Sequence, residues 1–198
     1  MVTNKHQDLI ERYGMMTAKE LSALRGLSLN SAQVTLLRAE RQGLVLRHPF
    51  NGKETYATTG QALRREALEN AYAVLLDCAE RSATKLTAQE VKRCFGWIPE
   101  RVPVMLSEGD IALAVVDHGS DVCYLLRRVQ RLCERLSLFE DYLKWLEAKR
   151  LSIRVLSSSR ANAHSLAREV EKLGLPVPIV PVYHVAYGHL VERKNGHA

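Results

Sequence analysis

The sequence feature that most constrains the fold is a series of glycines near the start of the chain, each following a short segment with helical spacing of apolar residues. These glycines are Gly14, Gly26 and Gly43. Glycine adopts the left-handed conformation that ends many helices without strain. The three positions therefore predict the ends of three short helices. The predicted helices are His6 to Tyr13, Ala18 to Gly26, and Asn30 to Gln42.

Residues suited to capping precede two of these helices. Thr17 and Glu20 have the spacing of a capping box, in which each side chain bonds the backbone amide of the other residue. Ser28 or Asn30 can accept hydrogen bonds from the first free amides of the third helix. The side of the third helix that is predicted to be buried is apolar and consists of Leu29, Val34, Leu37 and Leu44.

A hairpin of two strands is predicted after the third helix. The strands are residues 44–48 and 54–58, and the Asn-Gly pair at 51–52 tolerates the positive φ angles of tight hairpin turns. Thr59 is then positioned to cap a long helix over residues 60–81. The predicted order of this region is three helices, a two-stranded hairpin and a further helix.

Three segments of this region resemble the winged-helix core of bacterial regulators of the MarR type. They are Met16 to Leu21, Gly26 to Ala32, and Arg41 to Val45. The resemblance implies a winged helix-turn-helix whose third helix enters the major groove of double-stranded DNA. It also implies that the hairpin, or wing, contacts the backbone or the minor groove. The alternative is a winged helix that binds another protein, and the basic third helix and basic hairpin argue against it.

The residues predicted to contact DNA fall into two groups. Contacts with base edges are predicted for the outward polar residues of the third helix: Ser28, Asn30, Ser31, Gln33, Thr35 and Arg38. Amide side chains pair with adenine, arginine pairs with guanine or phosphate, and hydroxyls pair with either. Attraction to phosphates is assigned to the basic residues that follow: Arg41, Arg47, His48 and Lys53. The formal net charge of +6 suits a polyanionic partner without specifying one.

The rest of the chain has the pattern of a small α/β domain. Residues 83–101 are predicted to be a linker with a short helix, which leaves 1–82 and 102–198 as the two domains. Continuous apolar strands alternate with helices, and this pattern is typical of parallel strand pairing. Strands are predicted at 102–106, 111–116, 153–156 and 177–185, and helices at 122–149 and 161–173.

The layout of residues 102–185 is similar to the restriction-endonuclease-like domain of plasmid replication-relaxation proteins. A nuclease of that fold needs an acid near the first strand, and an acid, one residue and a lysine on the second. Asp117 is followed by His-Gly instead, so we predict an inactive scaffold without catalytic residues, metal or cofactor. The predicted role of Asp117 is to cap the next helix. The alternative is a displaced metal site that combines Asp110, Asp117 and Arg127 or a lysine.

The helix predicted at 122–149 has an apolar stripe on one face and arginines on another. The stripe is Val122, Leu125, Leu126, Val129, Leu132, Cys133, Leu136, Phe139, Leu143 and Leu146. The arginines are Arg127, Arg128, Arg131 and Arg135. One interpretation packs the stripe on the sheet and leaves the arginines in solvent. The other uses part of the stripe to form a homodimer, whose two winged helices would read a palindrome.

The cysteines and the apolar segments indicate a cytoplasmic protein. The four cysteines are Cys78, Cys94, Cys123 and Cys133, and no two of them form a CxxC pair. We therefore predict that they are small core residues in a reducing compartment. No apolar run is long enough for a transmembrane helix, and the first residues do not resemble a secretory signal.

The leading hypothesis from the sequence is a non-enzymatic, sequence-specific DNA-binding protein that regulates transcription. The resemblance of the second domain implies a gene on a plasmid or another mobile element. One alternative is an accessory factor that binds an origin of conjugative transfer or replication and recruits a relaxase or replication protein. The other alternative is a metal-dependent nuclease with a displaced active site.

Overall fold

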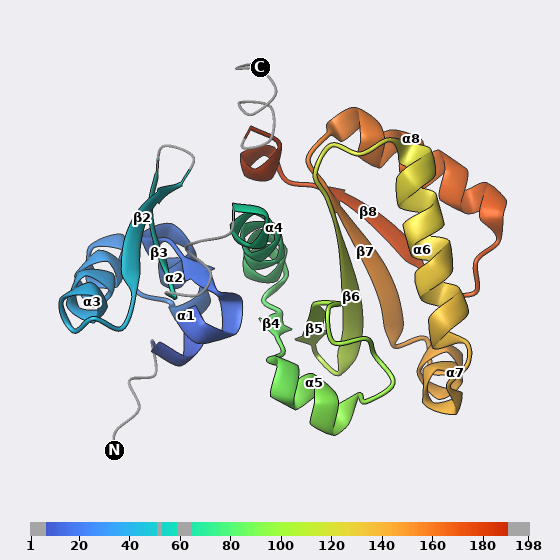
Figure 1. The fold of residues 1–198 in the computed structure, drawn as a ribbon, viewed down its shortest axis with the longest axis horizontal. Helices are drawn as coiled ribbons and strands as arrows, with labels where there is room; N and C mark the ends of the chain where they lie inside the picture. The colour runs from blue at the N-terminus through green and yellow to red at the C-terminus, as the bar shows by residue number, and fades with distance from the viewer. Residues whose placement is uncertain (1–6, 51–52, 59–64, 190–198) are drawn as a thin grey trace. The chain divides into compact units, whose positions relative to one another are not determined.

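The computed structural model describes residues 7–50, 53–58 and 65–189. The chain forms two compact units, residues 1–82 and residues 83–198, each with its own internal contacts. The chain contains helices and two sheets, so the fold is α+β (Figure 1). This confirms the predicted fold class at the coarse level of α+β. None of the described helices is both long enough and apolar enough to cross a membrane.

The first unit joins a set of helices to a small antiparallel sheet. The helices are α1 (Gln7–Tyr13), α2 (Ala18–Arg25), α3 (Leu29–Arg41) and α4 (Arg65–Arg81). The strands are β1 (Met15–Met16), β2 (Leu46–Phe50) and β3 (Lys53–Ala57), with β3 in the middle. Because α4 packs against α1, α2 and β1, the core of this unit lies between the helices and the sheet.

Local capping explains where α2 and α3 begin. The Thr17 hydroxyl oxygen accepts a hydrogen bond from the Glu20 amide, and Ser28 accepts one from the Ser31 amide in the same way. Gly26 closes α2 in the left-handed conformation with φ 62°, where any other side chain would be strained. The predicted boundaries of these helices therefore agree with the structure to within one residue, and the first of the two candidate residues, Ser28, caps α3.

The two strands of the hairpin have the predicted length of five residues, but both lie closer to the turn than predicted. Phe50 pairs with Lys53, so β2 continues two residues beyond its predicted end. Pro49 fits within β2 because β2 is an edge strand, where an amide that faces away from the sheet has no partner to lose. The predicted turn at 51–52 and the predicted cap Thr59 lie outside the described residues.

The second unit is a mixed sheet with helices packed on it. The strands are β4 (Thr84–Lys85), β5 (Val104–Ser107), β6 (Asp110–Asp117), β7 (Leu151–Ser157) and β8 (Ile179–Tyr183), in that order across the sheet. The helices are α5 (Ala88–Cys94), α6 (Val122–Leu136), α7 (Glu140–Glu147) and α8 (Arg160–Leu173). Strands β6, β7 and β8 are parallel, and α6 and α8 pack together on one side of them (Figure 1).

The helix predicted at 122–149 is in fact two helices, α6 and α7. The Ser137 hydroxyl ends α6 by donating to the Glu134 carbonyl at 2.8 Å. The change of direction brings Tyr142 of α7 into the core, where its ring meets Trp97 at 6.1 Å between centroids. The predicted apolar stripe is therefore interrupted after α6, and of its later members Leu146 packs against the core. Two of its later members are exposed, Phe139 and Leu143.

Residues 83–101 belong to the second unit, which corrects the prediction of a linker. The strand β4 pairs with β5, and the segment supplies the core residues Val91, Phe95, Trp97 and Ile98. The Phe95 ring makes edge contacts with Trp97 at 6.4 Å and with Trp145 at 5.6 Å. The sequence conceals this strand because a two-residue edge strand needs only backbone hydrogen bonds, which polar residues make as well as apolar ones.

The four cysteines are free thiols, but only two of them are core residues. Cys78 and Cys133 are buried, whereas Cys94 and Cys123 are exposed. Burial raises the pKa of the Cys133 thiol to about 11, so this thiol stays protonated and unreactive at neutral pH. The exposed pair corrects the prediction that all four cysteines lie in the core.

Replacing Thr87 with alanine should destabilise the second unit by about 1 kcal/mol. Thr87 and Glu90 form a capping box at the start of α5, and the Thr87 amide donates to Glu90 Oε2 at 2.7 Å. Trp97 and Trp145 are the two tryptophans of the chain and both lie in this unit, so their fluorescence during urea unfolding reports its stability. Thr87→Ser keeps the hydroxyl and should unfold like the parent. Equal midpoints for Thr87→Ala and the parent would contradict the cap.

Candidate nucleic-acid interface

The buried side of α3 differs from the predicted one. Ala32, Leu36 and Ala39 are buried, and their spacing of four and three residues places them on one face, while α3 packs against α2. Val34 is 50% exposed and Leu29 is 58% exposed, so the prediction that they are buried is wrong. Alanines permit close helix packing but carry little weight in a hydrophobicity pattern, which explains the error. The other two predicted residues are half-buried, Leu37 and Leu44.

An outward row runs along the opposite face of α3. It consists of Asn30, Val34, Arg38 and Arg41, whose successive spacings of four, four and three residues keep them on one side of the helix. All four side chains are exposed, and none forms a hydrogen bond or ion pair with another described residue. The row therefore offers an amide, an apolar group and two guanidinium groups to solvent.

The predicted hydroxyl contacts of α3 are occupied by local hydrogen bonds. The Ser28 and Ser31 hydroxyls lie 2.8 Å apart, and Ser28 also accepts from the Ser31 amide. The Thr35 hydroxyl donates to the Ser31 carbonyl at 2.9 Å. Gln33 is exposed and makes no side-chain hydrogen bond with another described residue. Among these four predicted base-reading residues, Gln33 is therefore the one that keeps its polar group available.

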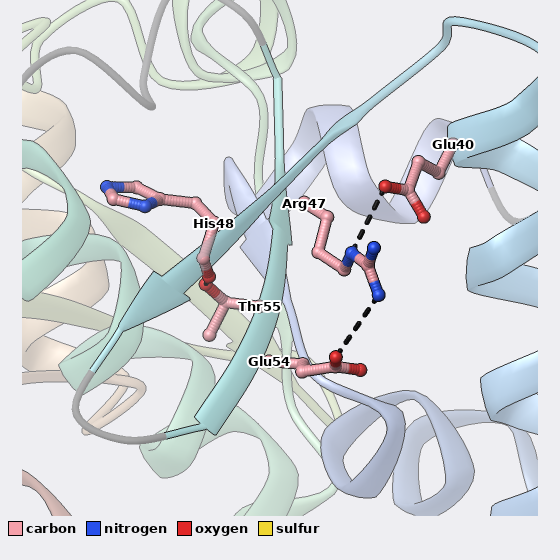
Figure 2. A network of polar contacts seen from close by, with 5 residues as sticks. All are labelled: Glu40, Arg47, His48, Glu54 and Thr55. Carbon is pink, nitrogen blue, oxygen red and sulfur yellow. Dashed lines mark hydrogen bonds and ion pairs between the residues drawn. The ribbon is translucent and has the colours of Figure 1, made fainter.

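Arg47 of the hairpin is balanced by two carboxylates. Its Nε lies 3.2 Å from Glu40 Oε1 on α3, and its Nη1 lies 3.2 Å from Glu54 Oε1 on β3, as Figure 2 shows. Exposed ion pairs of this kind contribute about 0–1 kcal/mol each. Arg47 thus links α3 to the hairpin, and its charge is less available to a phosphate than the sequence suggested. The hairpin register, which sets Arg47 diagonally across from Glu54, is what brings this pair together.

His48 and Lys53 differ in how they face solvent. The His48 side chain is half-buried and points away from Arg47, because successive residues of a strand face opposite sides (Figure 2). Its carbonyl accepts a hydrogen bond from the Thr55 hydroxyl. Lys53 is exposed and has no ion pair with another described residue. Of the predicted phosphate contacts, Lys53 and Arg41 are therefore the exposed cations without an ion pair in the described part of the chain.

Glu20 is buried close to this surface, which the sequence did not predict. Its side chain is only 4% exposed, and its Oε2 atom has no hydrogen-bond partner among the described residues. Burial raises the pKa of the Glu20 carboxyl, and the positive charges of Lys53 and Lys19 lower it by smaller amounts. The pKa of Tyr72 is raised to about 12, by burial and then by the charge of Glu20. Glu20 is thus a poorly solvated acid in the first unit.

The acids predicted as a displaced metal site in the second unit cannot share one ion. Asp110 and Asp117 are the first and last residues of β6, which places them about 23 Å apart at the usual rise of a strand. Asp110 is exposed and its Oδ1 lies 3.3 Å from Nε of Arg150. Arg127, the third residue of that alternative, is an exposed residue of α6. This geometry overturns the proposed combination of the three residues.

Asp117 is fully buried, and its carboxylate is used inside the fold. Oδ1 accepts from the Gly119 and Ser120 amides at 2.9 and 2.7 Å, and Oδ2 accepts from the Ser157 hydroxyl at 2.8 Å. These bonds hold the turn after β6 and link it to the end of β7. The residue that caps α6 is Asp121, which corrects the prediction that Asp117 does so.

Tyr187 secures the same end of β6. Its hydroxyl donates to the Asp117 carbonyl at 2.8 Å, and the same oxygen lies 3.1 Å from Nδ1 of His118. Because a hydroxyl has one proton and this proton goes to the carbonyl, His118 donates to Tyr187 from Nδ1. The polar residues after β6 are thus joined to one another, and among the described residues no three metal-binding side chains form a cluster.

Comparison with protein-family models, curated proteins and solved structures gives no match for the chain. The candidate interface therefore depends on the outward row of α3 and the exposed cation of the hairpin. The sequence indicated most of these residues, but it missed Val34, the balancing of Arg47 and the burial of Glu20. A spacing of alanine, leucine and alanine at 32, 36 and 39 is the signal that would have placed Val34 outward.

Replacing Glu20 with glutamine should stabilise the first unit at neutral pH by an amount of order 1 kcal/mol. The folded-state pKa is raised above its usual 4.5, so just above pH 4.5 the folded protein binds more protons than the unfolded chain. The stability contributed by the carboxyl is then largest below pH 4.5 and falls as the pH rises through the raised value. Glutamine keeps the shape of the Glu20 side chain but does not ionise, so this contribution to the pH dependence of stability is removed.

The measurement is urea unfolding followed by far-ultraviolet circular dichroism, at pH 4.5 and at neutral pH. Tryptophan fluorescence reports the second unit in the same samples. Glu66→Gln, at an exposed position of α4, is the control and should leave stability within about 0.5 kcal/mol of the parent. A Glu20→Gln variant that loses stability equally at both pH values would show that the buried acid is not strained by desolvation.

Proposed function

We propose that the first unit binds double-stranded DNA with α3 in the major groove, and that the chain acts as a sequence-specific transcription regulator. The single observation that carries this proposal is the outward row of α3. Its side chains present amide, apolar and guanidinium groups on one helix face without a bond to another described residue. Those are the groups that read base edges in the major groove, which is about 12 Å wide and admits a helix.

The order of elements in the first unit supports a winged helix-turn-helix as the form of this DNA reader. Three helices precede the β2–β3 hairpin, and α2 and α3 pack against each other. The helix that would enter the groove has thirteen residues and is capped by Ser28. Its outward residues begin in the first turn, and in helix-turn-helix proteins the N-terminal residues of the recognition helix contact the bases.

The charges near α3 support a contact with the phosphate backbone. Arg41 and Lys53 are exposed and have no ion pair with another described residue. Arg47 can also contact a phosphate only if it gives up one of its two carboxylate partners, Glu40 or Glu54. Each such exposed pair contributes about 0–1 kcal/mol, so exchange for a phosphate costs little. Binding that relies on these contacts weakens as salt rises, because counterions are released from the DNA.

The proposal includes no dimer surface. The part of the predicted apolar stripe that lies on α6 packs in the core of the second unit, where Leu125, Val129 and Leu136 are fully buried. Among the stripe residues, Phe139 and Leu143 are exposed and would be available to a homodimer. Regulation of transcription and location on a mobile element are parts of the proposal that rest on the sequence resemblance alone.

Replacing Asn30 or Arg38 with alanine should weaken binding to a preferred site by about 1–3 kcal/mol each, since each side chain would pair with a base edge. The site is first obtained by selection from random double-stranded DNA with the full chain. Lys53→Ala should instead lower affinity for all sequences. It should also reduce the salt slope, which is the steepness with which the logarithm of the affinity falls with the logarithm of the salt concentration, by about one. Lys92→Ala, on the exposed side of α5, is the control for charge. No enrichment of any sequence would contradict the proposed function.

Val34 should contact the methyl group of a thymine, because it is the apolar residue at the centre of the outward row. Replacing that thymine with deoxyuracil in the selected site removes one methyl group, and affinity should fall about fourfold, the value for one buried methylene. Affinity of the Val34→Ala variant should be insensitive to the same replacement. Deoxyuracil scanning by fluorescence anisotropy measures both. Equal sensitivity of parent and variant at every thymine would exclude the contact.

A further inference from the structure

A row of arginines lies on the solvent side of α6 in the second unit. Arg127, Arg131 and Arg135 are exposed and are separated by four residues each, so they share one helix face. Glu134 is the single carboxylate within α6. The opposite face of the helix is apolar and is buried in the core, so the arginine face is the side that α6 presents to solvent.

These arginines lack the acidic partners that two lysines of the second unit have. None of the three forms an ion pair with another described residue. In contrast, Lys144 lies 3.1 Å from Glu140, and Lys172 lies 2.7 Å from Glu169. A row of like charges without such partners is a local cost to the folded state, because neighbouring positive charges on a helix repel each other. An anionic partner would remove that cost.

Arg128 and Tyr124 extend the same face. The Arg128 Nη1 donates to the Val116 carbonyl at 3.0 Å, and its guanidinium carbon lies 5.9 Å from the centre of the Tyr124 ring. The Tyr124 ring is 53% exposed. Arg128 is thus held at the edge of the arginine row. The guanidinium groups of the other three arginines donate to no other described residue and can donate to a ligand.

The spacing of the row fits the backbone of a nucleic acid. Four residues of an α-helix advance about 6 Å, so the three arginines span about 12 Å. One strand of a DNA duplex advances about 3.4 Å per phosphate along its axis, so that span matches roughly three phosphates. An anionic membrane is a poorer fit, because membrane-surface helices expose large apolar residues opposite their cations and α6 buries its apolar side.

We propose that the α6 arginine face binds the phosphate backbone of double-stranded DNA as a second, sequence-independent contact. The inference depends on the proposed function only in that both contacts act on the same DNA. Because the two units belong to one chain, the second contact takes place at a high effective concentration once the first has formed. It strengthens binding without changing which sequence is preferred.

The test compares the full chain with the variant Arg127→Gln/Arg131→Gln/Arg135→Gln. Its salt slope for duplex DNA should be smaller than the parent's by about two to three, at about 0.9 for each phosphate that the variant no longer neutralises. Affinity for duplexes of random sequence at low salt should fall about tenfold or more. Preference for the selected site over random sequence should be unchanged. Tryptophan fluorescence checks that the second unit is folded.

The matched control is Lys144→Gln/Lys149→Gln/Lys172→Gln, which removes the same charge from the same unit. Its salt slope should stay within about one of the parent's. If the arginine variant and this control have equal slopes, the inference is wrong. It is also wrong if the arginine variant loses binding only to phosphatidylserine vesicles. Failure of the proposed function appears differently, as a parent chain that has no preferred sequence whatever the α6 variant does.

Discussion

The burial of Ala32, Leu36 and Ala39 is the constraint on which the candidate interface depends. These residues lie on one face of α3, and the helix cannot rotate about its axis without exposing Leu36. The rotation fixed in this way turns Asn30 and Val34 toward solvent. It also places Glu40 of α3 beside the hairpin, where it reaches Arg47. The face that is offered to a ligand is therefore a consequence of how α3 packs.

The order of the helices in the first unit could be predicted because the signals that start and stop helices are local, whereas the short strand β1 between the first two helices was not predicted. Thr17, Ser28 and Gly26 act through bonds and backbone angles within a few residues, and the structure has them in those roles. The rotation of α3, the break between α6 and α7, and the strand β4 depend on distant partners. Tyr142, for example, turns inward to meet Trp97, which lies far away in the sequence.

The sequence predicted which residues belong to the candidate site better than it predicted whether their side chains are available to a ligand. The residues named from the sequence lie at the surface or half-buried, but their surroundings decide which are available. Arg47 is balanced because the hairpin register brings Glu54 to it and helix packing brings Glu40. The burial of Glu20 likewise follows from the packing of α2 in the first unit. The spacing of residues along the sequence predicts neither the ion pairs of Arg47 nor the burial of Glu20.

The parallel pairing of β6 with β7 has a consequence for synthesis of the chain. Ile111 pairs with Leu151, which is 151 − 111 = 40 residues later, while the antiparallel partner β5 precedes β6 directly. At about 5–20 residues per second, one edge of β6 waits roughly 2–8 seconds for its partner to leave the ribosome. Residues 111–117 of β6 are all buried in the folded unit. During that interval, the nascent chain exposes an unpaired apolar strand edge, which is open to aggregation.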